Sequence, residues 1–253
     1  MKSFRQFISE SQWMYHGTTR NDLESLTPNR DDSMIDRAIG SHFAADKRVS
    51  DKFSKDLYGG SNSKGSVYKT RSPHRSKLLT IHQKIYPHGE VSSDQSSIGA
   101  HVSSTVFSHP DNKHMFIDWV KNARRVNDEI AHAIYDKLSK GKAPADKKFG
   151  TAASKNSPSF FSYMKNFDSG LHTQPRDGFK REVIDSYLKI MKSRGIKGLV
   201  YKNTSPREME GIPKDSKRTP RPKNLSGSNK SYILFNPNEH EHPLIKIDKV
   251  DNG

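Results

Sequence analysis

Two short stretches decide the fold of this chain: Tyr15-His16-Gly17-Thr18 and Gly40-Ser41-His42-Phe43-Ala44. Residues 13–18 and 41–44 read as strands, and the pattern over 46–57 predicts a helix after the second strand. Ser50 and Phe53 lie on neighbouring turns of that helix, ten and thirteen residues after Gly40. The spacing therefore predicts that two strands and a helix bring these side chains together.

These residue types suit a flat ligand with a polar edge. A planar ring such as nicotinamide needs an aromatic face on either side and a few fixed polar groups for its amide. Gly17 has no side chain, so its backbone can approach a carboxamide closely, and Ser50 can hydrogen-bond to the same amide. His42 and Phe53 can enclose the ring, while His16 can reach a ribose hydroxyl. The structural alternative is a strand end, a turn glycine and two core aromatic side chains.

The arrangement resembles the nicotinamide pocket of the ADP-ribosyltransferases related to diphtheria toxin and to the poly-ADP-ribose polymerases. In that family a strand ends in His-Gly, Gly-x-Tyr-Phe-Ala opens a second strand and helix, and a serine and an aromatic residue follow at the same two spacings. The resemblance implies an α+β fold with a split, mostly antiparallel sheet and a helical insert, NAD as the substrate, and transfer of ADP-ribose with loss of nicotinamide. It implies the following NAD-binding residues: His16, Gly17, Thr18, His42, Ser50 and Phe53.

Two aromatic positions depart from the family pattern. His42 replaces the stacking tyrosine, and Phe53 replaces the second tyrosine. The nicotinamide ring is cationic before its bond breaks, so a protonated imidazole would repel it. Because the unperturbed pKa of histidine is about 6.5, we expect His42 to act in its neutral form.

The C-terminal third carries a second resemblance to the family, and the matching pieces together cover roughly half of the chain. Residues 195–203 and 231–237 are similar to the last strands of bacterial and phage transferases. In the polymerase-like members a catalytic glutamate directly precedes the final strand, and Ser231 occupies that position here, with Lys230 before it. Because related phage sequences often carry Glu-Gly after Tyr-x-Asn, the resemblance implies Glu210 as the catalytic carboxylate, with Glu208 second and His16 assisting at the ribose. The alternative is a solvated acidic pair, which would leave a slow transferase or an inactive NAD binder.

The composition is strongly basic. Of the 253 residues, 43 are Lys or Arg and 28 are Asp or Glu, a net charge of +15. Such a charge attracts nucleic acid, acidic proteins or a membrane surface, although solubility or passive packaging with DNA explains it equally well. Only 31% of the residues are hydrophobic and the mean hydropathy is −0.90, which predicts a modest core with long polar loops. The chain has no cysteine, which excludes disulfides and thiolate metal sites.

A basic loop is expected over 214–230, where Pro220, Pro222 and the preceding Pro213 keep the backbone extended. In the family the loop before the last strand lies at the acceptor site. A basic loop there favours an anionic acceptor, either nucleic acid or a host protein that works on nucleic acid. A solvated loop is the alternative.

Residues 1–10 resemble the capsid-targeting leader of proteins packaged inside T-even-like phage heads. The resemblance implies cleavage after Glu10, a mature domain over 11–253, and a location inside the capsid head followed by the host cytoplasm. The alternative is an ordinary N-terminal helix that docks on the domain.

The remaining patterns concern packing. A short helix is expected over 22–26, and helical spacing continues from Asn112 to Lys140 with Asp111 as N-cap, within an insert of about 88–178. Another amphipathic helix is expected over 182–194. Glu239-His240-Glu241-His242 alternates ligand types without a third group at helical spacing, so we predict no metal site there. No run of about 20 apolar residues occurs, so we expect no membrane span, and we expect a monomer.

The sequence thus favours NAD-dependent ADP-ribosylation of a host protein or nucleic acid by a phage protein injected with DNA. The rival is a non-catalytic, basic internal head protein that binds DNA and keeps a transferase-like fold. A third possibility is chemistry on a nucleic-acid end.

Overall fold

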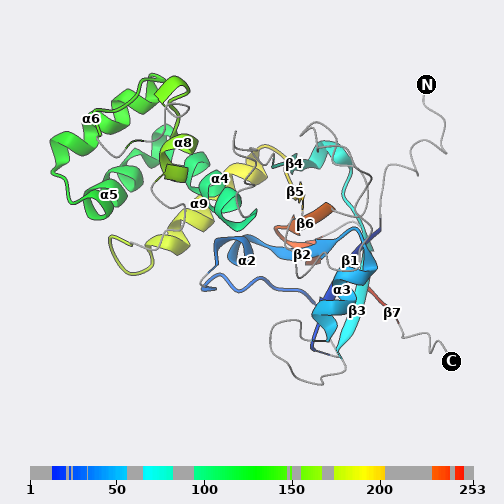
Figure 1. Ribbon diagram of the computed structural model, residues 1–253. Helices are drawn as coiled ribbons and strands as arrows, with labels where there is room; N and C mark the ends of the chain where they lie inside the picture. The colour runs from blue at the N-terminus through cyan, green and yellow to red at the C-terminus, as the bar shows by residue number, and fades with distance from the viewer. Residues whose placement is uncertain are drawn as a thin grey trace, which may run out of the picture. The chain divides into compact units, whose positions relative to one another are not determined.

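The residues that the structure describes form a mixed α+β molecule with one seven-stranded sheet and seven α-helices (Figure 1). A computed structural model describes residues 13–20, 23, 25–32, 34–55, 65–81, 94–146, 149, 155–166, 174–202, 230–239 and 243–247. The chain forms two compact units. Residues 1–29, 39–94 and 195–253 make up the sheet unit, and residues 30–38 and 95–194 make up the helical unit.

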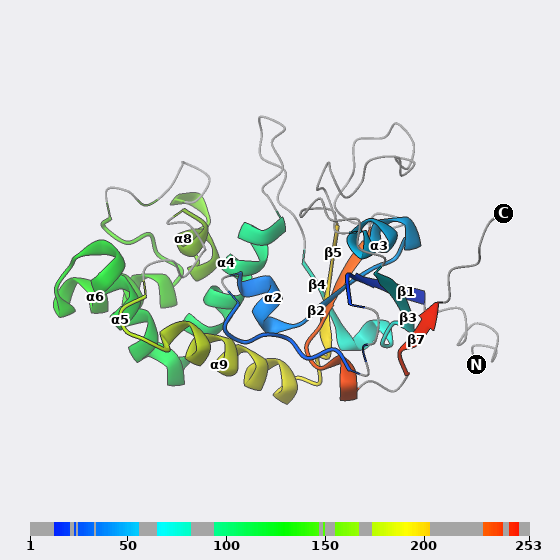
Figure 2. The same cartoon turned by 90° about the horizontal axis from the view of Figure 1, so that it is seen from below.

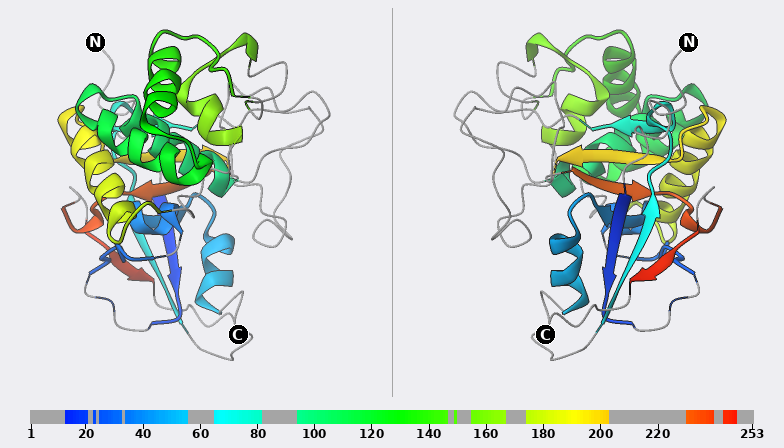
Figure 3. Two further views of the ribbon diagram at one scale, coloured as in Figure 1. Left: turned by 90° about the vertical axis from the view of Figure 1, so that its left-hand side faces the viewer. Right: turned by 90° about the vertical axis from the view of Figure 1, so that its right-hand side faces the viewer.

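The sheet unit contains all seven strands, in the order β4-β5-β6-β2-β1-β3-β7. Their bounds are β1 Trp13–Thr18, β2 Ser41–Ala44, β3 Ser66–Arg71, β4 Leu78–Thr80, β5 Gly198–Lys202, β6 Lys230–Leu234 and β7 Ile245–Ile247. β4 and β5 run parallel, and every other neighbouring pair is antiparallel (Figure 3). The predicted strands over 13–18 and 41–44 are confirmed.

The sheet is narrowest between β1 and β2. These strands share the single register pair Tyr15 and Ala44, whereas β1 and β3 are paired from Trp13 to Thr18. The His16 Nδ1 atom bonds across this junction to the backbone oxygen of His42 at 2.7 Å. The strands nevertheless form one continuous seven-stranded sheet, in place of the split sheet that was predicted.

Helix α3 (Lys47–Ser54) follows β2 directly and packs on β1, β2 and β3, as Figures 1 and 2 show. Asp46 caps it, because its carboxylate accepts a hydrogen bond from the Arg48 backbone N–H at 2.9 Å. Val49, Ser50 and Ser54 form its buried face. The helix is shorter than the predicted 46–57. It begins at Lys47 and ends at Ser54, and Lys55 is its C-cap residue.

The main core cluster of the sheet unit combines residues from four strands and one loop. Its buried members are Met14, Leu26, Phe43, Val200, Tyr232 and Leu234. The predicted helix over 22–26 is wrong for the described residues 23, 25 and 26, which are not helical. The backbone N–H of Leu23 donates to the Tyr68 hydroxyl and that of Leu26 to the Asn238 side chain, so tertiary partners replace helical ones.

The helical unit contains most of the helices. Their bounds are α2 Ile35–Ile39, which ends in the sheet unit, then α4 Asp94–Phe107, α5 Lys113–Arg124, α6 Asp128–Ser139, α8 Phe160–Asn166 and α9 Phe179–Ser193. An aromatic cluster forms its core, in which the Phe116 ring lies 5.2 Å from Phe160 and 6.2 Å from Trp119. The predicted insert of about 88–178 covers α4 to α8 of this unit, which continues through α9 to Arg194.

The apolar run from 112 to 140 does not form one helix. Arg125 has a left-handed backbone (φ 53°) that ends α5, and Asn127 caps α6 by accepting from the Ile130 N–H at 2.9 Å. Ile130 is consequently 47% exposed instead of joining the apolar stripe. Asp111, the predicted N-cap, lies in the 3-10 helix Pro110–Asn112 that precedes α5.

Candidate functional site

Three elements of the sheet unit carry the predicted site residues. β1 holds His16, Gly17 and Thr18, β2 holds His42, and α3 holds Ser50 and Phe53. Because α3 packs directly on β1 and β2, the two stretches that lie far apart in sequence meet in the fold.

Gly17 lies directly against the backbone of α3. A Cβ atom added to it would sit 1.8 Å from the Ser50 carbonyl oxygen and 2.6 Å from the Ser50 carbonyl carbon. Only glycine permits this approach, so the residue type at 17 is required by the packing of helix on strand. The predicted contact between its backbone and a carboxamide stays a prediction.

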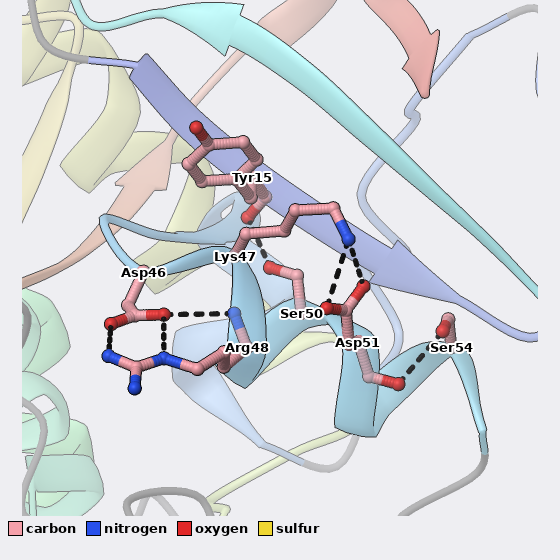
Figure 4. Close-up of polar contacts among 7 residues, drawn as sticks. All are labelled: Tyr15, Asp46, Lys47, Arg48, Ser50, Asp51 and Ser54. Atoms are coloured by element: carbon pink, nitrogen blue, oxygen red, sulfur yellow. Dashed lines mark hydrogen bonds and ion pairs between the residues drawn. The ribbon is translucent and has the colours of Figure 1, made fainter. Parts of the chain in front are cut away.

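Ser50 is buried at 2% exposure and is oriented by β1. Its hydroxyl donates to the Tyr15 carbonyl oxygen at 2.8 Å (Figure 4). Since that bond uses the only hydroxyl proton, Ser50 can serve a carboxamide only as an acceptor from the amide N–H. In the predicted contact, Ser50 would therefore accept a hydrogen bond and the carboxamide N–H would donate it.

His16 is held as a neutral imidazole of defined tautomer. A backbone carbonyl only accepts, so the 2.7 Å contact with the His42 oxygen places the proton on Nδ1 and makes Nε2 the acceptor. Burial lowers the pKa of His16, the hydrogen bond to His42 opposes this in part, and the charge of His42 adds to the lowering. A neutral Nε2 is suited to accept from a hydroxyl group. The ring also lies 5.5 Å from the Phe43 ring, which is a packing contact.

His42 is paired with a residue that the sequence analysis did not include in the site. Its Nδ1 atom lies 3.2 Å from the Tyr201 hydroxyl, and the two rings meet edge-on at 6.5 Å. Tyr201 lies in β5, in the stretch ending at residue 203 from which only a strand was predicted. The order of the strands, which places β6 between β5 and β2, could not be inferred from that stretch.

Four residues that are in register form a row across the sheet, and Tyr201 is one of them. Tyr15 pairs with Ala44, Ala44 with Ser231, and Ser231 with Tyr201, across β1, β2, β6 and β5. Residues in register share one face of a sheet. Ser231 on β6 therefore lies between Ala44 on β2 and Tyr201 on β5. The position at which the resemblance places a glutamate thus holds a buried hydroxyl group (5% exposed).

The other predicted residues lie near this row or outside the described chain. Phe53 is half-buried and packs against Ala44 and Val49, and the Thr18 hydroxyl accepts from the Arg20 N–H at 3.2 Å. Glu208 and Glu210, the loop from 214 to 229 and the leader 1–10 lie outside the described residues.

Two further findings concern the described residues only. They contain no group of three or more histidine, aspartate or glutamate side chains placed to hold a metal ion. None of their helices has both the length and the apolar character needed to cross a bilayer.

Comparison of the chain with protein-family models, curated proteins and solved structures finds no match.

Proposed function

We propose that this protein is an NAD-dependent ADP-ribosyltransferase that acts on a host protein or nucleic acid. One observation supports it above the others: Gly17 and Ser50 are in direct contact where α3 packs on β1, and His42 of the neighbouring strand β2 is paired with Tyr201. The proposal extends to an ADP-ribosyltransferase-like fold, with the narrow junction between β1 and β2 in place of a full split.

The residues have distinct roles in the proposed reaction. The Gly17 backbone and the Ser50 Oγ atom bind the carboxamide, and His42 and Phe53 enclose the ring. The His16 Nε2 atom accepts from a ribose hydroxyl, and the neutral state of His16 avoids repulsion with the cationic ring.

The transfer itself exchanges one bond for another. The bond between ribose C1 and the nicotinamide nitrogen breaks, nicotinamide leaves with the electron pair, and the acceptor nucleophile bonds to C1. The acceptor proton passes to a carboxylate, for which we propose Glu210, with Glu208 as the second choice. The same carboxylate favours the positive charge that develops on the sugar.

Two serines of α3 provide a matched test. Ser50 and Ser54 are both 2% exposed, and each donates to a backbone carbonyl, Tyr15 at 2.8 Å and Asp51 at 2.9 Å respectively. Ser50→Ala and Ser54→Ala should each destabilise the fold by about 1 kcal/mol, because each loses one hydrogen bond. Only Ser50→Ala should also lower the rate of label transfer from radiolabelled NAD to host lysate, by about tenfold or more.

Calorimetry with NAD at millimolar concentration supplies the second readout. No heat of binding and no labelled acceptor with the wild-type protein would overturn the proposal. Equal loss of transfer in both serine variants would remove Ser50 from the site.

A non-catalytic internal head protein that binds DNA remains the second candidate function. The net charge of +15 and the hydroxyl group of Ser231 in the glutamate position favour it. Tight, sequence-independent DNA binding without any transfer of label would establish it, and label on RNA or DNA ends would instead identify a nucleic-acid acceptor.

The proposed location is the inside of the capsid head, followed by the host cytoplasm. Mass spectrometry of purified virions tests it directly. A mature chain that begins at Ser11 supports the leader, and the absence of the protein from virions would contradict it.

A further inference from the structure

The His42 side chain contacts Tyr201, a residue two strands away in the sheet. Tyr201 is in register with Ser231 on β6, and Ser231 is in register with Ala44 on β2, two residues after His42. Residues two apart in a strand share a face, so Tyr201 and His42 lie on the same face of the sheet. Ser231, which lies between the two strands, has a short side chain, and the Tyr201 hydroxyl comes within 3.2 Å of the His42 Nδ1 atom.

Two contacts of different kinds orient the His42 ring. The first is the hydrogen bond to Tyr201. The second is the edge contact of the two rings, whose centroids lie 6.5 Å apart at an interplanar angle of 80°. Because an edge-to-face pair has a preferred orientation, the two contacts together restrict rotation of the imidazole ring. Tyr201 is itself only 8% exposed, so packing fixes its own ring.

The pair also selects one tautomer of His42. A neutral histidine has one ring nitrogen that donates and one that accepts, whereas a tyrosine hydroxyl can do either. The phenol hydroxyl is the stronger donor of the two groups, and a ring nitrogen without a proton is the stronger acceptor. The hydrogen bond then runs from Tyr201 to Nδ1, and the His42 proton lies on Nε2.

We propose that Tyr201 is a positioning residue: its hydroxyl donates to the His42 Nδ1 atom and holds this ring in one orientation and in the Nε2–H tautomer. His16 fixes the backbone of the same residue, because its Nδ1 atom donates to the His42 carbonyl oxygen at 2.7 Å. The two histidines consequently carry opposite groups at Nε2, an acceptor on His16 and a donor on His42.

The consequence for NAD rests on the proposed function. Tyr201 does not touch the ligand in this proposal and acts through His42, which encloses the nicotinamide ring. A side chain that is already held in its binding orientation loses less conformational entropy when the ligand binds. The Tyr201 hydroxyl should therefore contribute to the affinity for NAD.

The first test needs no NAD. It follows the two ring nitrogens of His42 by NMR in the full chain with ¹⁵N-labelled histidine, at a pH well above the unperturbed histidine pKa of about 6.5. The signals are assigned by their loss in His42→Gln. In the wild type, Nδ1 should carry no proton and Nε2 should carry one.

Two tyrosine variants show whether the hydroxyl of Tyr201 is responsible. Tyr201→Phe keeps the aromatic ring and removes only the hydroxyl, so it should shift the Nδ1 signal and give a mixture of the two tautomers. The control is Tyr232→Phe, which removes the hydroxyl of a buried tyrosine on the neighbouring strand β6. Tyr232 follows Ser231 and faces the other side of the sheet, so its variant should leave both His42 signals in place.

The second test is a double-mutant cycle on the KM for NAD. Tyr201→Phe should raise KM about three- to tenfold, as expected for one lost hydrogen bond, with little change in kcat. In a His42→Phe background the same substitution should raise KM less than about twofold, because Tyr201 acts through His42. An equal rise in both backgrounds would reduce Tyr201 to a structural role.

Three results of the NMR test would overturn the positioning role: a proton on Nδ1 in the wild type, unchanged His42 signals in Tyr201→Phe, or the same change in Tyr232→Phe. The first of these needs no variant to fold. If the signals change as expected while the wild-type protein neither binds NAD nor transfers label, the positioning role stands and the proposed transferase function fails.

Discussion

At the scale of single residues, the backbone contact between Gly17 and Ser50 sets the distance between α3 and β1. The space for a Cβ atom at 17 is filled by the Ser50 carbonyl group, and the Ser50 hydroxyl group bonds to the Tyr15 carbonyl of the same strand. The first contact is between two backbones, and the second joins a short side chain to a backbone carbonyl. Their geometry therefore tolerates little adjustment.

Gly17→Ala should consequently destabilise the fold more than an ordinary surface substitution. The added methyl group must displace α3 or the strand, which corresponds to a cost of about 1–3 kcal/mol for overpacking. Urea denaturation measures the loss, with the exposed position Thr19→Ala as the control. An unfolding free energy equal to that of the control would show that the helix moves freely relative to the strand.

The candidate site was only partly foreseeable at this scale. The glycine, serine and aromatic positions could be selected from their spacing, since spacing within one strand and one helix is local. Tyr201 could not, because its hydroxyl group reaches His42 through the pairing of β5 with β6 and of β6 with β2.

At the scale of elements, the break between α5 and α6 is decided by two residues. Arg125 takes a left-handed backbone conformation, and Asn127 supplies the cap for the next helix. The apolar residues from 115 to 138 keep helical spacing on both sides of the break, so the hydrophobic pattern alone predicted one helix. Capping chemistry overrides periodicity here.

Arg125→Gly should stabilise the helical unit. A non-glycine residue in the left-handed region costs about 1–2 kcal/mol of folding free energy. Glycine avoids this cost but loses more conformational entropy on folding, which offsets part of the gain. We expect a net gain of about 0.5–1 kcal/mol by chemical denaturation. Asn127→Ala is the opposing variant and should lose about 1 kcal/mol with its cap. A loss of stability in Arg125→Gly would mean that the arginine side chain holds the helices together.

At the scale of the whole molecule, each unit contains a partly buried histidine whose pKa is lowered. Burial lowers the pKa of His16 in the sheet unit. In the helical unit, burial and then the Arg194 charge lower the pKa of His101 to about 4. The His101 ring packs edge-on at 5.8 Å from the Tyr187 ring, and its Nε2 atom has no hydrogen-bond partner among the described residues.

Acid should therefore unfold this protein before its carboxylates titrate fully. The unfolded chain takes up a proton on His101 near pH 6.5, whereas the folded chain does so only near pH 4. The stability is fully present above pH 6.5 and is lost as the pH falls toward 4, at up to about 1.4 kcal/mol per pH unit for one proton. The unfolding free energy of His101→Phe should depend less on pH over this range than that of the wild type. If the two free energies change with pH in parallel, the loss of stability does not come from His101.

The amino-acid sequence by itself determined what depends on neighbours along the chain. Residues 13–18 and 41–44 form strands, Asp46 starts α3, and Ser50 and Phe53 lie on that helix, because these features follow from local pattern and capping. Only the tertiary structure decided which strands are neighbours. The pairs His42–Tyr201 and Lys202–Lys230 depend on strand order and register, and the Gly17–Ser50 contact depends on the packing of α3 on β1. Partners in a sheet are chosen by packing between residues far apart in sequence, which no local pattern encodes.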